Sequence, residues 1–380
     1  MHIGFFTYGM GEKLTGIGRY TVELSRALQA LDPSLRITLL NPYPHSRLPW
    51  YQEFPNYPLP QLQRVPAAAS LGHWQLHRAA ARLELDILHD PCGIAPFWWP
   101  PLAAMRRYKR VTTIHDAIPL VTPQLQPLAT RLIFRTLIPA ARYSADAVIT
   151  VSQAAAQDIR HYAGIPAHKL HVTPNGIRPE PTPSPEQCEA CLQRLDIQRP
   201  YLLYVGNLAP RKNLARVLEA FMQLQQDSDA PEAALQLVIV GPASWRAHET
   251  FALAEQSAQV RFTDYVSDED LQVLYHRASA LVFPSLYEGF GLPVLEAMQQ
   301  GTPVITSNTS SLPEVAGDAA LLVDPEDSQA IAAAVRRIIS DPAYSAALVA
   351  KGRERVKQFS WQTTASLTLE LYQQLCKHNS

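Results

Sequence analysis

Short apolar runs alternate with segments of helical periodicity along almost the whole chain of 380 residues, and this alternation restricts the fold more than any other feature. The runs are almost continuously apolar, as is typical of parallel strands that helices cover on both faces. Helices between them, such as those at 17–31 and 214–224, carry apolar stripes with the period of an α-helix. The predicted strands are 2–7, 36–40, 85–89, 110–114, 146–151 and 170–173 in the first half, and 201–205, 235–240, 259–263, 279–284, 302–306 and 319–323 in the second.

A proline-rich stretch divides the two sets of strands. Residues 178–186 read RPEPTPSPE, with four prolines in nine residues, which is typical of a stiff connector rather than a helix. We therefore predict an α/β chain of two Rossmann-like, doubly wound parallel-sheet domains that face each other across a ligand-binding cleft. The predicted parts are a first domain, a linker, a second domain and a C-terminal helix that packs back on the first domain: 1–178, 179–199, 200–360 and 361–380.

Charge and cysteine content exclude several classes of protein. The 33 Lys and Arg residues and 34 Asp and Glu residues give a net charge of −1, which does not suit a general nucleic-acid binder. Residues 1–178 carry a net charge of +8 and residues 179–380 one of −9, which indicates either an anionic partner of the first half or ordinary solvated surfaces. The Cys188–Cys191 pair lacks the further ligands of a zinc site. The sequence shows no secretory leader pattern and no long apolar run, so we expect a cytoplasmic protein.

The most informative stretch, at 283–307, reads FPSLYEGFGLPVLEAMQQGTPVITS and combines a glycine turn with two carboxylates. Because the turn lies between a predicted strand and a predicted helix, its backbone N–H groups can bind an anion. Glu288 begins the turn and Glu296 lies one turn inside the helix, and carboxylates accept hydrogen bonds from sugar hydroxyls. The pattern predicts a ligand with both phosphate and hydroxyl groups. The alternative is an ordinary strand–turn–helix with solvated glutamates.

Adjacent cations follow the first predicted strand of the second half. Arg211 and Lys212 stand within YVGNLAPRKNLARVLEAF at 204–221, at the start of a predicted helix. An arginine fork and a lysine point charge at the carboxyl end of a strand can neutralise a diphosphate. The alternative is a solvated surface pair.

A glycine-rich loop follows the first strand of the chain. Gly16 and Gly18, near the end of this loop at 11–18, open the next helix and can cradle a phosphate. The dinucleotide-binding fingerprint is incomplete, because Thr21 occupies the third glycine position and Asn41 replaces the acid that binds a ribose. The sequence therefore disfavours NAD as a ligand.

Histidines and a short acidic run are further candidates. His115 follows a predicted strand, where it can donate or relay a proton near neutral pH, although most single histidines are structural. His73 and His77 have the spacing of metal ligands but lack the glutamate of HExxH, so we interpret them as part of a helix face. Asp268 begins a DxD sequence that resembles a metal motif, but Ser267 before it indicates a helix cap. No metal site is predicted.

An aromatic and basic segment precedes the fourth strand. Residues 97–110 read FWWPPLAAMRRYKR and place three aromatic residues beside four Lys or Arg residues and a tyrosine. This pattern suits an interface with anionic lipids. Core packing is the alternative.

Together, these segments resemble the family 4 glycosyltransferases, which are retaining enzymes of the GT-B fold with two Rossmann-like domains. The resemblance extends over nearly the full chain, and it is greatest to mannosyltransferases of bacterial surface-polysaccharide assembly, including lipopolysaccharide biosynthesis. It implies that 1–178 is the acceptor-side domain and that 200–360 binds the nucleotide sugar. Arg178 is a departure, since the family often has Asp there. The motifs are GIGRY at 16–20, HD at 115–116, VITVSQ at 148–153, PNGI at 174–177, YVGNLAPRKN at 204–213, EGFGLPVLEA at 288–297 and GTPVITS at 301–307.

The resemblance assigns a role to each matching residue. It implies that Glu288 holds hydroxyls of the transferred sugar and that Glu296 holds the nucleotide ribose. It implies that Arg211 and Lys212 stabilise the diphosphate leaving group and that His115 lies beside the donor sugar. The further donor-binding residues that it implies are Gly16, Gly18, Gly289, Phe290, Gly291, Leu292, Val266 and Asp268.

The predicted function is retaining transfer of a hexose, with mannose from GDP-mannose as the preferred choice, to a glycan or lipid-linked acceptor in cell-surface polysaccharide biosynthesis. No cofactor or metal is expected, because the nucleotide sugar is a substrate and fixed cations can stabilise the leaving group. The expected partners are the donor, the saccharide acceptor and, through a peripheral contact, the inner face of an anionic membrane. The alternatives are a nucleotide-sugar epimerase of the same fold and a non-catalytic nucleotide-sugar-binding scaffold.

Overall fold

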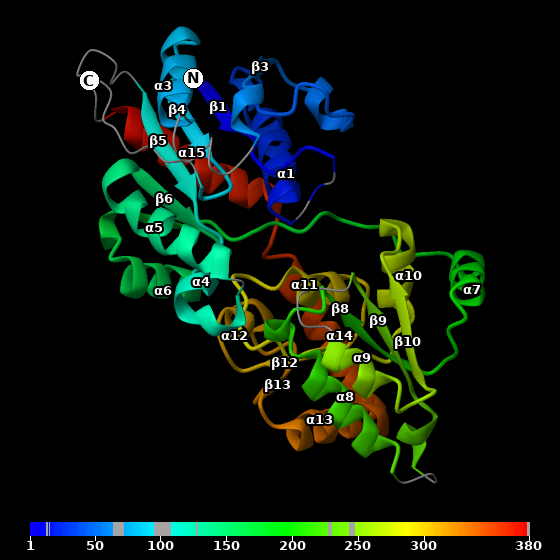
Figure 1. Ribbon diagram of the computed structural model, residues 1–380. Helices are drawn as coiled ribbons and strands as arrows, with labels where there is room; N and C mark the ends of the chain where they lie inside the picture. Colours follow the sequence, from blue (N-terminus) through cyan, green and yellow to red (C-terminus); the bar gives the residue numbers. More distant parts are fainter. Residues whose placement is uncertain are drawn as a thin grey trace. The chain divides into compact units, whose positions relative to one another are not determined.

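The computed structural model consists of two α/β units, each built on a parallel sheet with helices on both faces (Figure 1). Unit 1 comprises Met1–Gly176 and Ser360–Ser380, and unit 2 comprises Ile177–Phe359. The predicted architecture of two parallel-sheet α/β domains is therefore confirmed. The structure describes residues 1–12, 14, 16–63, 72–94, 108–126, 128–226, 230–242 and 248–377.

The sheet of unit 1 has the strand order β3-β2-β1-β4-β5-β6-β7, and all its pairs are parallel. Six of its strands coincide with predicted runs. The edge strand β3 is absent from the prediction because its three residues, Asn-Tyr-Pro, form no apolar run. The strands are β1 (His2–Phe6), β2 (Arg36–Asn41), β3 (Asn56–Pro58), β4 (Ile87–Asp90), β5 (Lys109–Thr113), β6 (Ala147–Thr150) and β7 (Leu170–Val172).

Helices cover both faces of this sheet, because successive strand residues point to opposite sides. In β1, Ile3 and Phe5 pack with α1 and α15, whereas Phe6 packs with α3. In β6, Val148 packs with α5 and α6. The helices of unit 1 are α1 (Gly16–Leu31), α3 (Gly72–Arg82), α4 (Ile118–Val121), α5 (Leu128–Ser144), α6 (Gln153–Ala163) and α15 (Trp361–Lys377), with short 3-10 helices at Pro49–Gln52, Pro60–Leu62, Pro123–Leu125 and Ala167–Lys169.

The C-terminal helix α15 belongs to the core of unit 1, although more than 180 residues of unit 2 separate it from the rest of that unit in the chain. It packs lengthwise against α1. Its inner face, including Leu369 and Tyr372, is buried against the sheet. The Thr364 hydroxyl donates to the Pro174 carbonyl (2.6 Å) and ties the helix to the segment after β7.

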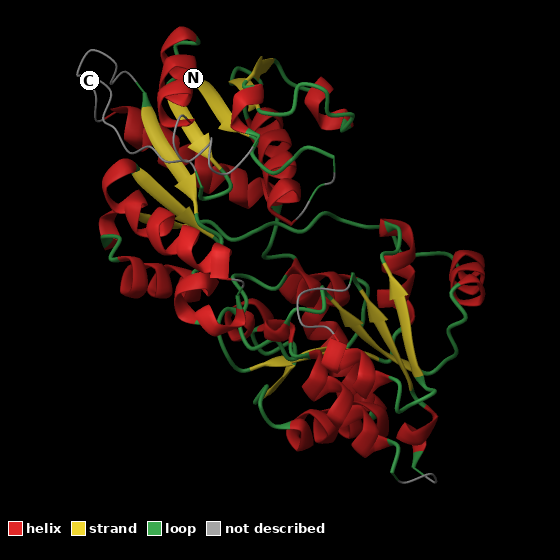
Figure 2. Cartoon of the chain, in the orientation of Figure 1, coloured by secondary structure: helices red, strands yellow, loops and turns green. Residues whose placement is uncertain are grey.

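The sheet of unit 2 has the order β10-β9-β8-β11-β12-β13 and is also parallel throughout; Figure 2 shows its strands with the helices that surround them. All six strands coincide with predicted runs. They are β8 (Tyr201–Val205), β9 (Gln236–Val240), β10 (Val260–Asp264), β11 (Ala280–Phe283), β12 (Val304–Ser307) and β13 (Leu321–Val323). The helices are α7 (Pro185–Arg194), α8 (Leu214–Leu224), α9 (His248–Ala254), α10 (Asp268–Arg277), α11 (Leu292–Gln299), α12 (Leu312–Ala316), α13 (Ser328–Ser340) and α14 (Pro342–Val356), with 3-10 helices η6 (Pro210–Lys212) and η7 (Pro231–Ala234).

The segment 179–199, predicted as a linker, lies within unit 2 and contains α7. Ser184 caps this helix: its hydroxyl accepts from the Gln187 N–H, and the Gln187 side chain accepts from the Ser184 N–H. Cys188 and Cys191 are buried against Val273, and neither forms a disulfide. The prolines therefore keep only the stretch before α7 non-helical, because Ser184 and Pro185 together start a helix.

The segment 97–110 lies mostly outside the described residues. Of its last three residues, Tyr108 is buried, and Lys109 and Arg110 begin β5. Among the helices in the described ranges, none is both long and apolar enough to cross a membrane.

Candidate active site

The candidate donor site of unit 2 lies where β8 and β11 end. These strands are neighbours in the sheet, and the chain leaves them in opposite directions along the strand order. Ligands of doubly wound sheets bind at such a switch point, beside the carboxyl ends of the strands. The segment after β8 carries Arg211 and Lys212, and the segment after β11 carries Glu288.

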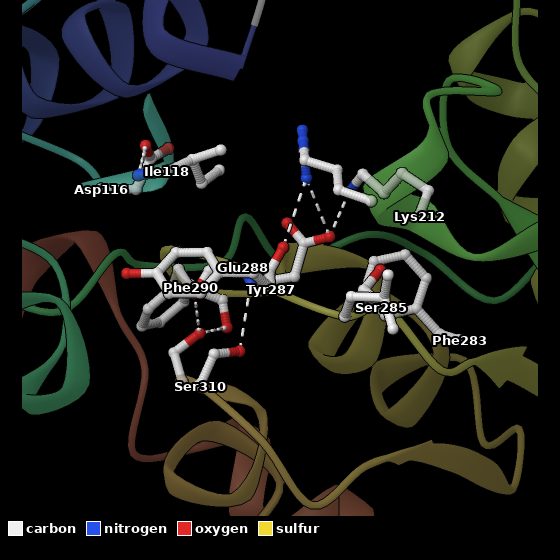
Figure 3. Close-up of polar contacts among 12 residues, drawn as sticks. Asp116, Ile118, Lys212, Phe283, Ser285, Tyr287, Glu288, Phe290 and Ser310 are labelled. Atoms are coloured by element: carbon white, nitrogen blue, oxygen red, sulfur yellow. Dashed lines mark hydrogen bonds and ion pairs between the residues drawn. The ribbon is translucent and has the colours of Figure 1, made fainter. Parts of the chain in front are cut away.

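The carboxylate of Glu288 binds both cations. Its Oε1 lies 2.6 Å from Lys212 Nζ and 3.2 Å from Arg211 Nη1. Figure 3 shows the Lys212 and Glu288 side chains directed toward each other. Lys212 Nζ also lies 4.8 Å from the ring centroid of Phe283, the last residue of β11. Glu288 and Lys212 are 8% and 9% exposed, so this ion cluster is held in a largely desolvated place.

The ion cluster fixes the protonation state of Glu288. Burial by itself would raise the pKa of the carboxyl, but the charges of Lys212 and Arg211 outweigh burial and lower the pKa below its usual value. Glu288 is therefore an ionised acceptor of hydrogen bonds at neutral pH.

The backbone that carries the two cations is tied to β8 and to the segments that follow β11 and β13. The Tyr204 hydroxyl donates to the Lys212 carbonyl (3.2 Å), and the Leu286 N–H donates to the Arg211 carbonyl (2.8 Å). Asn213 adopts a left-handed conformation (φ 61°), and its amide donates to the carbonyls of Pro284 (2.9 Å) and Pro325 (2.6 Å). Asn213 was not predicted from the sequence; its signal is that asparagine, among non-glycine residues, tolerates this conformation well.

Two serines after β12 hold the loop that carries Glu288. The Glu288 N–H donates to Ser310 Oγ (3.1 Å), as Figure 3 shows. The Ser311 hydroxyl contacts the carbonyls of Glu288 and Phe290, each at 2.9 Å. Neither serine was predicted, because the order β11-β12 that brings them to this loop is not visible in the sequence.

The predicted strand–turn–helix is present, and its turn requires glycine at position 291. Gly291 has φ +102° at the start of α11, and a Cβ added there would lie 2.6 Å from Leu312 Cδ2. Pro293 occupies the first turn of the helix, where its missing N–H costs nothing. The turn Gly289–Leu292 therefore presents backbone amides beside the ion cluster.

Glu296, inside α11, is tied to α10 instead of to the ion cluster. The buried Tyr275 hydroxyl donates to Glu296 Oε2 (2.8 Å). The same helix α10 begins at Asp268, two residues after the buried Val266, so Tyr275 links Glu296 to the helix beside which the other two implicated residues lie. As predicted, Ser267 caps this helix, since its hydroxyl accepts from the Asp270 N–H.

The remaining candidates, His115, Gly16 and Gly18, belong to unit 1. Gly16 opens α1, and a Cβ added there would meet no atom within 4 Å, whereas one at Gly18 would lie 3.0 Å from Leu14 Cδ2. His115 follows β5, and its Nε2 contacts the Pro91 carbonyl at 2.9 Å. Burial lowers the pKa of His115 to about 4. The sequence predicts that His115 can donate or relay a proton near neutral pH. In the structure its imidazole is neutral at that pH, because its pKa lies well below 7.

The two patterns that resemble metal motifs serve the packing and capping of helices. The buried ring of His77 contacts the Tyr108 hydroxyl, and the acidic run of Asp268 forms the first turn of α10. Within the part of the chain that the structure describes, no three His, Cys, Asp or Glu side chains are grouped so that they could hold a metal ion.

Comparison with known proteins identifies the family. Residues 14–181 match the Glycosyltransferase Family 4 domain, and residues 193–355 match the Glycosyl transferases group 1 domain. Over 392 aligned residues, the chain is 32% identical to O-antigen chain mannosyltransferase B of Escherichia coli, and the alignment covers 99% of this chain and 100% of the relative. The chain is a family 4 glycosyltransferase.

Solved structures show the fold of this glycosyltransferase. Sucrose-phosphate synthase from Thermosynechococcus elongatus superimposes with a TM-score of 0.76 at 24% identity, over 98% of each chain. HepE of Anabaena, solved with UDP and glucose, also superimposes with a TM-score of 0.76, at 20% identity, and the match covers 98% of this chain and 100% of HepE. The glycosyltransferase thus has the predicted GT-B fold, and its family favours hexosyl transfer over the epimerase and scaffold alternatives.

Proposed function

We propose that this glycosyltransferase transfers mannose from GDP-mannose, with retention of configuration, to a glycan or lipid-linked acceptor during cell-surface polysaccharide synthesis. The observation that carries the proposal is the ion cluster of Lys212, Arg211 and Glu288 at the switch point of unit 2. The choice of mannose rests on the O-antigen mannosyltransferase that aligns with the chain over its full length.

The two cations suit the leaving group. When the bond between the sugar and the diphosphate breaks, negative charge develops on the departing oxygen. Lys212 and Arg211 are fixed before any ligand binds, so they stabilise this charge without first reorganising, an effect worth about 2.7–4 kcal/mol per donor. Within unit 2, the amides of the turn Gly289–Leu292 are further proposed phosphate contacts. Gly16 and Gly18 of unit 1 are also proposed to bind phosphate.

The carboxylates suit the sugar and the ribose. Glu288 is ionised and accepts hydrogen bonds from hydroxyls of the transferred hexose, which places that sugar next to the cations. Glu296 binds the ribose hydroxyls, with Val266 and Asp268 beside the base. We assign retention to a short-lived oxocarbenium ion that the acceptor attacks from the face of the departing diphosphate. The anomeric configuration of the product, read from its NMR coupling constants, tests this assignment; inversion would contradict it.

The same cations can neutralise the diphosphate charge that a divalent metal would otherwise neutralise, so we propose transfer without a metal. Activity after exhaustive treatment with EDTA should equal that of the untreated protein. Loss of activity that Mg²⁺ or Mn²⁺ restores would contradict this part of the proposal.

A thermal-shift screen with GDP, UDP, ADP and their sugars tests the donor. A ligand at 100 times its Kd stabilises the protein by about 2.7 kcal/mol, which moves the melting midpoint visibly. We expect GDP and GDP-mannose to give the largest shifts. UDP-glucose is the second candidate, because HepE was solved with UDP and glucose, and a selective shift with UDP would favour it.

A transfer assay tests the ion cluster itself. Glu288→Gln keeps the shape of the side chain but removes the charge, and it should lower kcat/KM for the donor about 100-fold or more. The matched control is Glu219→Gln, which removes an exposed glutamate paired with Arg216 on α8 and should leave kcat/KM unchanged. Equal activity of the two variants would contradict the site.

We also propose that unit 1 contacts the cytoplasmic face of an anionic membrane, and α5 is the described surface that supports this. Leu128, Leu132 and Tyr143 of this helix are 68%, 57% and 77% exposed. Arg135 and Arg142 are also exposed, and residues 117–145 contain no Asp or Glu. Exposed apolar residues among arginines are typical of helices that lie in a lipid interface.

Flotation with liposomes tests this contact. The wild-type protein should float with vesicles that contain anionic lipid and much less with neutral vesicles. Leu132→Glu on α5 should reduce flotation, whereas Leu31→Glu, at the exposed end of α1 beside Asp32, should not. Failure of the wild-type protein to float with either kind of vesicle would refute the contact.

A further inference from the structure

A chain of buried polar side chains crosses the core of unit 1 and begins on the C-terminal helix. Tyr372, on α15, places its hydroxyl 2.5 Å from Nδ1 of His89, the third residue of β4. Nε2 of His89 lies 2.8 Å from the hydroxyl of Thr113, the last residue of β5. None of these three side chains has exposed surface.

The chain continues from Thr113 to His115. The Thr113 hydroxyl lies 3.3 Å from the hydroxyl of Tyr20, which is 2% exposed on α1. The Tyr20 ring packs edge-on against the His115 ring, with 4.8 Å between centroids and planes at 90°. Trp361, the first residue of α15, also packs against Tyr20 (5.9 Å). Helix α15 therefore contacts both ends of the buried polar chain formed by Tyr372, His89, Thr113 and Tyr20.

The orientation of the His115 ring decides what His115 can offer a ligand. A carbonyl only accepts hydrogen bonds, so the contact with Pro91 requires the proton on Nε2. Because burial lowers the pKa of His115 to about 4, the ring is neutral near pH 7 and Nδ1 keeps a lone pair. Nδ1 is then an acceptor for a hydroxyl, but only while Tyr20 and Pro91 hold the ring in place.

We propose that α15 positions His115 for the reaction: Tyr372, acting through the buried polar chain, holds the His115 ring so that Nδ1 accepts a hydrogen bond from a hydroxyl of the transferred sugar. This inference rests on the proposed placement of His115 beside the donor sugar. Tyr372, His89, Thr113 and Tyr20 are positioning residues, since His115 alone of the set would touch the ligand.

Stability alone does not account for the buried polar chain. The surrounding cluster is apolar, and replacing both partners of a buried hydrogen bond by apolar groups of the same shape is often nearly neutral for folding. What the polar chain adds is direction, because each hydrogen bond constrains the rotation of the next side chain. These constraints lead from Tyr372 to the ring of His115, which is partly exposed, whereas Tyr372, His89, Thr113 and Tyr20 are buried.

Unit 1 contains a matched control for this argument. Tyr108 and His77 form a second buried tyrosine–histidine pair. Tyr108 packs with α3 on the other face of the sheet, in a different apolar cluster from the one that holds Tyr20 and Tyr372. Tyr372→Phe and Tyr108→Phe therefore remove the same atom from the same kind of pair in the same unit.

Steady-state kinetics with the full-length protein test the proposal. Tyr372→Phe should lower kcat about tenfold with the KM for the donor unchanged, while Tyr108→Phe should keep the wild-type kcat. Similar melting midpoints for the two variants would show that the difference does not come from stability. Tyr20→Phe, at the other end of the polar chain, should lower kcat by a similar factor. It replaces Tyr372→Phe in this test if Tyr372→Phe folds poorly. Equal kcat values for Tyr372→Phe and Tyr108→Phe would overturn the proposal.

A double-mutant cycle separates this inference from the proposed function. If Tyr372 acts through His115, adding Tyr372→Phe to His115→Ala should lower kcat no further. Independent, multiplied losses would overturn the positioning role while leaving glycosyl transfer intact. An unchanged kcat in His115→Ala alone would instead refute the proposed placement of His115, and with it the inference.

Discussion

At the carboxyl edge of the unit 2 sheet, Arg211, Lys212 and Glu288 form an ion cluster, whereas His115, at the carboxyl edge of the unit 1 sheet, is neutral. In unit 2, the pKa of Glu288 is lowered because the charges of Lys212 and Arg211 outweigh its burial. In unit 1, burial lowers the pKa of His115 to about 4 and that of His89 to about 3, so both imidazoles are uncharged near pH 7. The same strand topology thus supports two kinds of electrostatic environment.

The difference matches the chemistry of a nucleotide sugar. The diphosphate changes its charge during transfer, and fixed cations stabilise that change best in a desolvated place. Sugar hydroxyls carry no charge, and a neutral acceptor orients them without attracting the phosphates. We therefore expect substitutions at the two edges to fail in different ways, and the following experiments are arranged from the largest expected effect to the smallest.

Removing a cation from unit 2 should have the largest effect. Lys212→Met should lower kcat/KM for the donor 100- to 1,000-fold, because the protein loses one of the two positive charges that stabilise the leaving group. The matched control is Lys351→Met, since Lys351 pairs with Asp318 on an exposed surface of the same unit and should not matter. A loss of less than tenfold for Lys212→Met would contradict the assigned role.

The glycines of the two edges should respond differently to a methyl group. Gly291→Ala meets Leu312 Cδ2 at 2.6 Å and has an unfavourable φ of +102°, so it should destabilise the protein by roughly 1–3 kcal/mol. Gly16→Ala meets no atom within 4 Å and should leave the melting midpoint unchanged. Any loss of activity in Gly16→Ala would then come from a weaker contact with the donor and not from a less stable fold. A midpoint lowered equally in both variants would break this distinction.

Acid should weaken unit 1 before unit 2. His115 and His89 have folded pKa values of about 4 and 3, below the ordinary histidine value of 6.5, so the unfolded chain binds more protons between pH 6.5 and 4. Their contribution is fully present above pH 6.5 and is lost as the pH falls through this window. The contribution of Glu288 is lost only as the pH falls below about 4.5, its ordinary value.

Hydrogen exchange between pH 7 and pH 5, corrected for intrinsic rates, can follow the two units separately. Peptides from the unit 1 core should lose protection first, and those from β8 and β11 should keep it. His115→Gln should reduce the pH dependence of unit 1. Earlier loss of protection in unit 2 would contradict the comparison.

The helix caps should give the smallest effect. Ser267→Ala in unit 2 and Ser152→Ala in unit 1 each remove a side chain that accepts a backbone N–H at a helix start, at a cost of about 1 kcal/mol of stability. Only Ser267→Ala disturbs the start of α10, where Val266 and Asp268 lie, so it alone should raise the KM for the donor. An equal rise in both variants would argue against nucleotide binding at α10.

Most of the fold was predictable because buried parallel strands are visible in a sequence as apolar runs of four to six residues. The strand β3 was not, since Asn56–Pro58 is only three residues long, lies at the sheet edge and forms no apolar run. Arg211, Lys212 and Glu288 were each recognised as candidates from their local motifs. Their direct pairing was not, because it depends on β8 and β11 being neighbours although 74 residues separate the two strands in the chain.

The residues that were not predicted share one property: their partners are distant in sequence. Asn213 contacts Pro284 and Pro325, and His89 contacts Tyr372, which lies 283 residues away. Local periodicity and motif spacing carry no information about such contacts. Such contacts follow from the order of the strands in each sheet. The sequence indicates that the sheets are parallel and covered by helices, but not which strands are neighbours.

The division of unit 1 into two stretches of chain has a consequence for synthesis on the ribosome. Unit 2 is continuous, but unit 1 lacks α15 until residues 360–380 have been made. At about 5–20 residues per second, the intervening residues take roughly 10 to 40 s to translate. During that time the apolar side chains that α15 later covers, such as Ile3 and Leu28, lack that cover. Unit 1 can therefore complete its apolar core only after unit 2 and α15 have been synthesised.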